Sequence, residues 1–185
     1  PFNALAQIKF KARIMRYTGD IWKNHPCCVI VAGQSLIQKK PAIVQKAVNA
    51  IVRAQAWCKN NPRETAHLLS RDGEGYLPLP EKVLAKVFQK PEHHELVHPG
   101  WQPARIGFQP YPFPSATRFI IDQMKATKVE GDVGFLQSLD TEAAVKELVD
   151  DRFVKAAVEQ AGGIKRFCAC DLTEAYTREE IVEIN

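Results

Sequence analysis

The chain has 185 residues, of which 45% are hydrophobic and 25% are charged, enough apolar material to build a single packed domain. No stretch offers the roughly 18 uninterrupted apolar residues that a membrane-spanning helix needs. The formal net charge of +4 comes from 25 basic and 21 acidic residues mixed along the chain. Because the sequence has no basic run, finger-type Cys/His spacing or ribonucleoprotein signature, it gives no support to nucleic-acid binding.

Residues 1–20 alternate partly between apolar and basic side chains, which predicts a strand or a connector ending in a turn at residues 18–20. Residues 27–32 (Cys-Cys-Val-Ile-Val-Ala) form a short continuous apolar run between a His-Pro pair and a glycine. A run without polar alternation is typical of a strand covered on both faces. The sequence therefore predicts an interior strand at residues 27–32.

The rest of the chain is mostly helical in pattern. Apolar residues at helical spacing, together with Pro, Ser, Asp or Thr at the expected starts, predict helices from Pro41, Pro62, Pro80, Ser115, Asp140 or Thr141, and Phe153, with Gly162 and Gly163 ending the last of these. A capping-box pattern at residues 177–180 predicts one more short helix. Residues 91–114 hold six prolines and predict a long, partly stiff loop. One or a few strands among about six helices indicate an α/β fold, as part of a larger sheet.

The five cysteines do not have the spacing of a structural zinc site. We expect Cys27, Cys28 and Cys58 to be small buried side chains. A metal site is a weaker alternative, and its candidate ligands are His93, His94, His98, Cys168, Cys170 and Asp171.

Four short stretches, in this order and spacing, resemble the nitrate, sulfonate and bicarbonate branch of ABC-transporter substrate-binding proteins, a group related to the yeast thiamine-pyrimidine synthases. They are residues 1–4 (Pro-Phe-Asn-Ala), 19–26 (Gly-Asp-Ile-Trp-Lys-Asn-His-Pro), 28–61 and 109–116 (Gln-Pro-Tyr-Pro-Phe-Pro-Ser-Ala). The resemblance implies a type II periplasmic-binding fold, in which two α/β lobes close over a ligand. We expect this chain to be the C-terminal portion of such a protein, a predominantly helical part of one lobe with a small, mostly buried sheet. The implied organisation is an inter-lobe connector at residues 1–20, a helix-rich lobe at 21–163 and a tail at 164–185.

The resemblance also points to a site for a small anion. Phe2 and Asn3 stand where family members commonly have an aromatic residue followed by Asn at the cleft. Lys23, between Trp22 and His25 in the loop before the apolar run, supplies a positive charge beside aromatic walls that lower the local dielectric. These five residues are the predicted ligand-binding set.

The expected function is therefore non-catalytic solute binding for an ABC-type importer, with no cofactor and no metal. Its expected partners are the anion and the transporter permease, and the expected location is periplasmic or extracellular, at the membrane only through the transporter. One alternative is an enzyme like the thiamine-pyrimidine synthases or a desulfinase, with Cys27 beside His25 as the nucleophile candidate. Another is a regulatory sensor lobe fused to a transporter or signalling protein.

Overall fold

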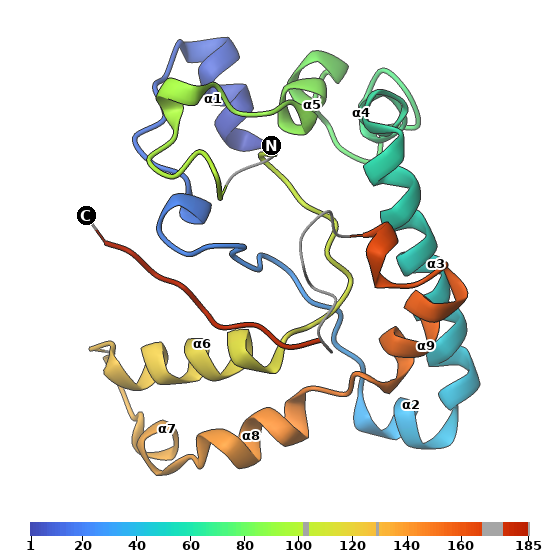
Figure 1. Ribbon diagram of the computed structural model, residues 1–185, viewed down its shortest axis with the longest axis vertical. Coiled ribbons are helices and arrows are strands. Elements are labelled where there is room, and N and C mark those ends of the chain that lie inside the picture. The colour runs from blue at the N-terminus through green and yellow to red at the C-terminus, as the bar shows by residue number, and fades with distance from the viewer. Residues whose placement is uncertain (102–103, 129, 168–175, 185) are drawn as a thin grey trace. The chain divides into compact units, whose positions relative to one another are not determined.

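The computed structural model describes residues 1–101, 104–128, 130–167 and 176–184, and the regular elements in these ranges are helices (Figure 1). The α-helices are α1 (Phe2–Phe10), α2 (Gln34–Lys39), α3 (Pro41–Asn60), α4 (Pro62–Leu69), α5 (Glu81–Phe88), α6 (Pro114–Ala126), α7 (Gly134–Ser138), α8 (Thr141–Leu148) and α9 (Arg152–Gln160). Short 3-10 turns are η1 (Thr18–Asp20), η2 (His93–Glu95) and η3 (Ile164–Arg166). The β-pairing in the described residues amounts to an isolated antiparallel bridge between Trp22 and Val182. The predicted α/β fold with a small buried sheet is therefore wrong for this chain, which is helical.

The apolar run at residues 27–32 shows why the prediction failed. The segment is not in a strand, and its side chains face solvent, with Val29 68%, Ile30 60% and Val31 87% exposed. Cys27 and Cys28 are exposed too, and Cys58 is half-buried, so the expectation of three buried thiols was also wrong. An apolar run becomes an interior strand only where neighbouring strands pair with its backbone, and no described residue does so here.

The beginning of the chain also differs from the prediction, because residues that suggested a strand or connector form helix α1. Ala4 is buried, and Leu5 packs against the same core. Lys11, with φ of 53°, ends the helix in the left-handed conformation, and its backbone N–H donates to the carbonyl of Ala6. Tertiary contact with α5 stabilises a helix whose sequence pattern is weak.

The residues divide into two compact units. The first unit comprises Pro1–His25, Ala54–Phe108 and Ile181–Asn185. Its core is built where α4 packs on α5 and α1 packs on α5, and its buried members are Ala4, Ala66, Leu79, Val83 and Leu84. Burial of each Leu or Val side chain among them contributes about 1.5–3 kcal/mol.

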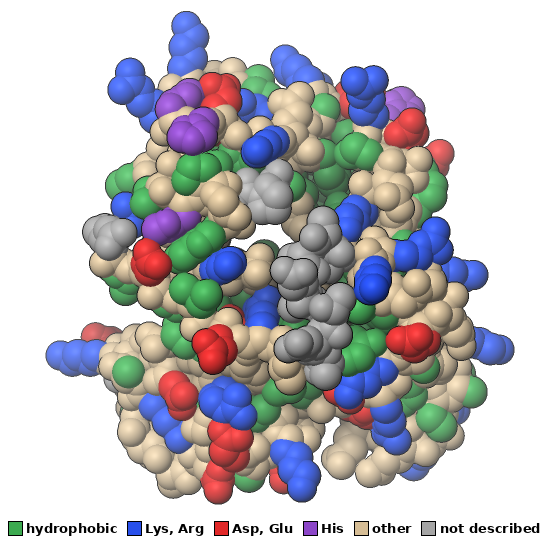
Figure 2. Space-filling view, viewed as in Figure 1, with side chains coloured by type: hydrophobic (Ala, Val, Ile, Leu, Met, Phe, Trp, Pro, Cys, Tyr) green, Lys and Arg blue, Asp and Glu red, His purple; other side chains and the backbone are tan. Residues whose placement is uncertain are grey.

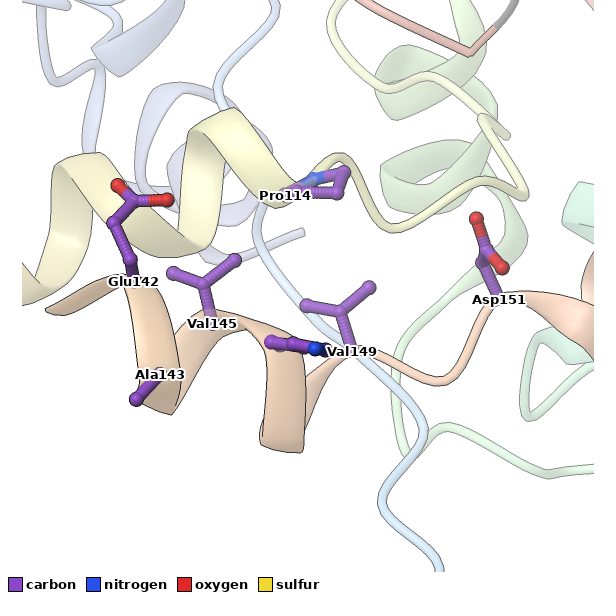
Figure 3. A pocket seen from close by; sticks show the side chains of 7 residues that line it. Pro114, Glu142, Ala143, Val145, Val149 and Asp151 are labelled. Carbon is purple, nitrogen blue, oxygen red and sulfur yellow. The ribbon is translucent and has the colours of Figure 1, made fainter.

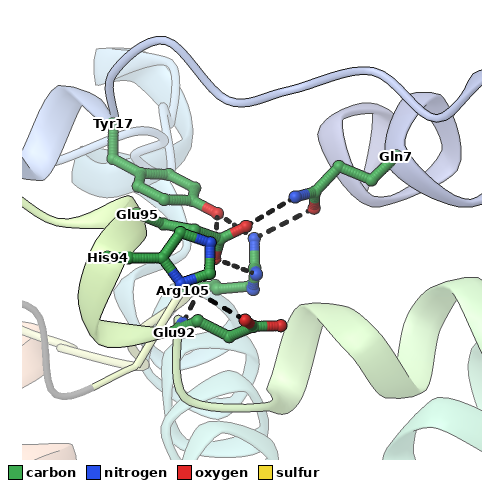
Figure 4. A network of polar contacts seen from close by, with 6 residues as sticks. All are labelled: Gln7, Tyr17, Glu92, His94, Glu95 and Arg105. Carbon is green, nitrogen blue, oxygen red and sulfur yellow. Dashed lines mark hydrogen bonds and ion pairs between the residues drawn. The ribbon is translucent and has the colours of Figure 1, made fainter.

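A buried polar network ties the loops of this first unit together (Figure 4). Arg105 Nη2 lies 2.6 Å from Glu95 Oε2, and these two side chains are only 7% and 9% exposed. Gln7 donates to the other oxygen of Glu95 at 2.6 Å, and Arg105 also donates to the hydroxyl of Tyr17. Burial raises the pKa of Tyr17 to about 12, so it stays a neutral hydroxyl. The network joins α1, the loop after it, η2 and the loop carrying Arg105.

The second unit comprises Pro26–Arg53 and Gln109–Glu180. Helix α6 packs on α8 and α7, around a core of Ile121, Ala144 and Val145. Tyr111, from the proline-rich loop, donates from its hydroxyl to Asp151 at 2.6 Å, and burial is the first cause of a raised Tyr111 pKa. The short helix predicted to begin at the capping box of residues 177–180 is not formed, and Arg178 and Glu180 pair at 2.8 Å in an irregular segment.

None of the helices in the described ranges combines the length and the apolar character required to cross a bilayer.

Candidate anion-binding site

The loop that carries the predicted ligand-binding residues is held by a buried carboxylate. Asp20, in η1, is completely buried, and its Oδ1 accepts from the backbone N–H of His98 at 3.1 Å. The turn continues with hydrogen bonds from the N–H groups of Ile21 and Trp22 to the carbonyl of Thr18. Asp20 therefore brings the segment around His98 to the loop, although 78 residues separate the two in sequence.

The C-terminal segment, residues 181–184, adds to the same loop. The backbone N–H of Lys23 donates to the carbonyl of Ile181 at 3.0 Å, and the N–H of Glu183 donates to the carbonyl of Ile21 at 2.9 Å. These two bonds flank the antiparallel bridge between Trp22 and Val182. The loop backbone is thereby fixed on both sides of Trp22.

Lys23 lies beside a stacked pair of rings. Its Nζ is 5.9 Å from the ring centroid of Trp101, and Trp101 stacks on His98 with ring centroids 4.0 Å apart and an interplanar angle of 17°. No carboxylate in the described ranges lies within ion-pair distance of the Lys23 ammonium. A half-buried lysine whose ammonium lies beside aromatic surface and has no fixed counter-ion among the described residues is a site to which an anion is attracted.

Trp22 and His25 form the other predicted pair in this loop. Their rings meet edge to face, with centroids 5.3 Å apart. Burial lowers the pKa of His25, so its imidazole is neutral at pH 7. Toward an anion, His25 is therefore a hydrogen-bond donor and not a second cation.

Phe2 and Asn3 occupy the first turn of α1, and both are exposed. No hydrogen bond or ring contact in the described ranges links either residue to the loop of Trp22, Lys23 and His25. Their predicted part in ligand binding stays a prediction.

Three members of the site were not predicted as ligand-binding residues. His98 was considered only as a metal ligand, and Trp101 and Glu183 were not considered. His98 and Trp101 lie in the proline-rich loop at residues 91–114, and its length was the available signal, because loops of this length inside a compact domain are usually functional. No local pattern in the sequence indicates that Asp20 is buried or that Glu183 contacts His98.

A groove in the second unit is a poorer candidate for an anion. Its volume is about 480 Å³, and α8 together with the start of α6 forms it (Figure 3). The lining residues are Pro114, Glu142, Ala143, Val145, Lys146, Val149 and Asp151. Both carboxylates of the lining already have cationic partners, Glu142 in Arg118 and Asp151 in Lys155. The lining itself supplies one ammonium, that of Lys146, and no aromatic side chain.

The alternative chemistries find less support. The hydrogen bond with Cys28, whose sulfur is 3.6 Å away, is the first cause of a raised pKa at Cys27, whereas nucleophilic cysteines have lowered pKa values. In the described ranges, no three His, Cys, Asp or Glu side chains are grouped as metal ligands would be. The candidate ligands Cys168, Cys170 and Asp171 lie outside the described residues.

The visible face of the molecule carries basic and acidic side chains side by side (Figure 2). The described charges on this face are therefore not gathered into one large patch, and attraction of an anion depends on local groups such as Lys23.

Comparison with known proteins gives one family. The model of the NMT1-like family matches residues 1–70, which include Trp22, Lys23 and His25 but not His98, Trp101 or Glu183. No curated protein and no solved structure matches the chain. Residues 1–70 of the chain are thus similar to the NMT1-like family.

Proposed function

We propose that the chain is part of the solute-binding component of an ABC-type importer and that it binds a small anion at Lys23. The NMT1-like match over residues 1–70 supports a relation to the solute-binding proteins of these transporters. The observation that carries the proposal is the Lys23 ammonium, which lies beside the Trp101 ring and has no described carboxylate partner.

The surroundings of Lys23 supply what a small oxyanion needs. The ammonium provides charge and hydrogen-bond donors, the imidazole rings of His25 and His98 carry further N–H groups, and the Trp101 ring beside Lys23 displaces water. A charge-assisted hydrogen bond is worth about 1.5–3 kcal/mol, which corresponds to roughly a tenfold to hundredfold change in affinity.

The proposed role is non-catalytic. The raised pKa of Cys27 supports this, because a thiol held in its protonated form is a poor nucleophile. In the proposed role the partner is the transporter permease, and the location is periplasmic or extracellular.

The test is calorimetric titration with nitrate, bicarbonate and methanesulfonate, first of the wild type and then of Lys23→Ala. We expect one of the three to bind and Lys23→Ala to weaken its binding by about tenfold or more. Lys9→Ala is the matched control, because Lys9 also lies over an aromatic ring, that of Phe10 at 5.3 Å, but on the exposed surface of α1. The proposal fails if none of the anions binds, or if the two variants bind equally well.

A further inference from the structure

We propose that Glu183 is an internal carboxylate that competes with the solute for the Lys23 site, so that the C-terminal segment, residues 181–184, regulates binding. The inference rests on the proposed function, because it needs an anion to bind near Lys23. Its starting observation is that the segment pairs with the same three residues, Ile21, Trp22 and Lys23, that form the centre of the loop.

The pairing brings the backbones of Lys23 and Glu183 close together. Trp22 and Val182 form the bridge, and Lys23 and Glu183 are each the next residue after this pair. The N–H of Lys23 bonds the carbonyl of Ile181 and the N–H of Glu183 bonds the carbonyl of Ile21, so the two residues occupy diagonal positions across the bridge.

Side-chain contacts agree with this register. Glu183 Oε2 lies 3.4 Å from Nε2 of His98, and His98 stacks on Trp101, which also lies beside Lys23. An anion attracted to Lys23 therefore meets a carboxylate already held at the same ring pair. Two negative charges this close repel each other, and binding of one opposes binding of the other.

The contact between Glu183 and His98 is weak enough for a bound anion to replace it. A separation of 3.4 Å is longer than a good charge-assisted hydrogen bond, and the side chain of Glu183 is 47% exposed. Only two backbone hydrogen bonds flank the bridge in the described residues, and an isolated pairing of this size opens readily. Release of residues 181–184 would remove the carboxylate and uncover the backbone of Ile21 and Lys23 together.

The test compares Glu183→Gln with Glu179→Gln in the full chain. Both changes remove one negative charge from the C-terminal region, but Glu179 is exposed and lies outside the paired segment. We expect Glu183→Gln to bind nitrate about fivefold or more tightly than wild type, and Glu179→Gln to bind it like wild type. If nitrate does not bind, bicarbonate and methanesulfonate are used in the same comparison.

A second measurement follows the amides of Lys23 and Glu183 by hydrogen exchange. In the absence of anion, both amides should exchange faster in Glu183→Gln than in the wild type. In the wild type, both amides should exchange faster with the anion bound than without it. Anion binding that depends on Lys23 but is the same in wild type and Glu183→Gln overturns the inference and leaves the proposed function standing. Absence of anion binding to the wild type overturns the proposed function and the inference with it, whereas binding to the wild type that is tighter in Glu183→Gln supports both.

Discussion

At the scale of single residues, the pair formed by Glu95 and Arg105 is the strongest polar contact of the first unit. Both side chains are more than nine-tenths buried, so neither charge can be compensated by solvent when the other is removed. We expect Glu95→Gln to lower the free energy of unfolding by about 3 kcal/mol, measured by chemical denaturation.

The matched control is Glu142→Gln, which breaks a comparable contact with Arg118 on the surface. Exposed ion pairs contribute little, so this variant should unfold close to wild type. Equal losses in the two variants would mean that burial does not set the strength of the Glu95 contact.

The same pair predicts how stability depends on acidity. Burial by itself would raise the pKa of Glu95, but the hydrogen bonds from Gln7 and the backbone of Glu92, together with the Arg105 charge, lower it below its ordinary value. The unfolded chain then binds the proton more readily than the folded chain. The stabilisation is fully present above the ordinary carboxyl pKa of about 4.3 and is lost as the pH falls through the lowered value. Glu95→Gln should therefore flatten the acid limb of a plot of unfolding free energy against pH, and an unchanged limb would contradict this assignment.

The candidate site shows which residues a sequence can indicate. Trp22, Lys23 and His25 could be predicted together because they are close in one loop. His98, Trp101 and Glu183 could not be assigned to that loop, because the contacts that bring them there span more than 70 residues of sequence. Long-range pairing of this kind has no local signature, and only the fold reveals it.

At the scale of elements, the ends of helices were predicted best, because the Pro and Gly residues that mark them act through their own backbone conformation. Pro41 and Pro62 stand at the first positions of α3 and α4, as expected from their fixed φ angle. Gly162 and Gly163, both with positive φ, follow α9 as predicted. Asn61, which precedes Pro62, does not cap α4 with its side chain, because that side chain donates to the carbonyl of Trp57.

The strand at residues 27–32 was predicted from a short apolar run and the residues that bound it, and the weakness of the argument is that all of this evidence is local. Side chains of high β-propensity favour a strand only in a sheet that covers them, so propensity here depends on partners that the local sequence does not specify. At α1 the error was the reverse, since a strand or connector was predicted and a helix is formed. The cause is again tertiary contact, because packing on α5 overrides the weak helical pattern of the sequence.

Two valine truncations test the exposure of this segment. Val31→Ala removes two methyl groups from a side chain that is 87% exposed, whereas Val83→Ala removes the same groups from a position that is 1% exposed. We expect the first to change the free energy of unfolding by less than about 0.5 kcal/mol and the second to lower it by about 2 kcal/mol. Denaturant unfolding of both proteins makes the comparison, and a large loss at Val31 would show that residues 27–32 are covered in solution.

At the scale of the whole molecule, the chain divides into two compact units, each with a buried apolar cluster among the described residues, and the match to the NMT1-like family does not follow this division. Residues 1–70 include α1, α2, α3 and α4, which contribute to both units. The proposed site lies in the first unit and uses one loop inside the matched range and two segments outside it. A function carried by this site therefore depends on residues that the family comparison does not reach.

The two buried clusters lead to a final prediction about local unfolding. Val83 is buried between α4 and α5, and Val145 is buried between α6 and α8, so truncation of either side chain removes apolar contacts from one core only. Hydrogen exchange measures the free energy of opening for each helix separately. We expect Val83→Ala to speed the exchange of amides in α4 and α5 while those in α6 and α8 keep their wild-type rates, and Val145→Ala to do the reverse. Equal acceleration in all four helices, in either variant, would mean that the two cores open as one cooperative structure.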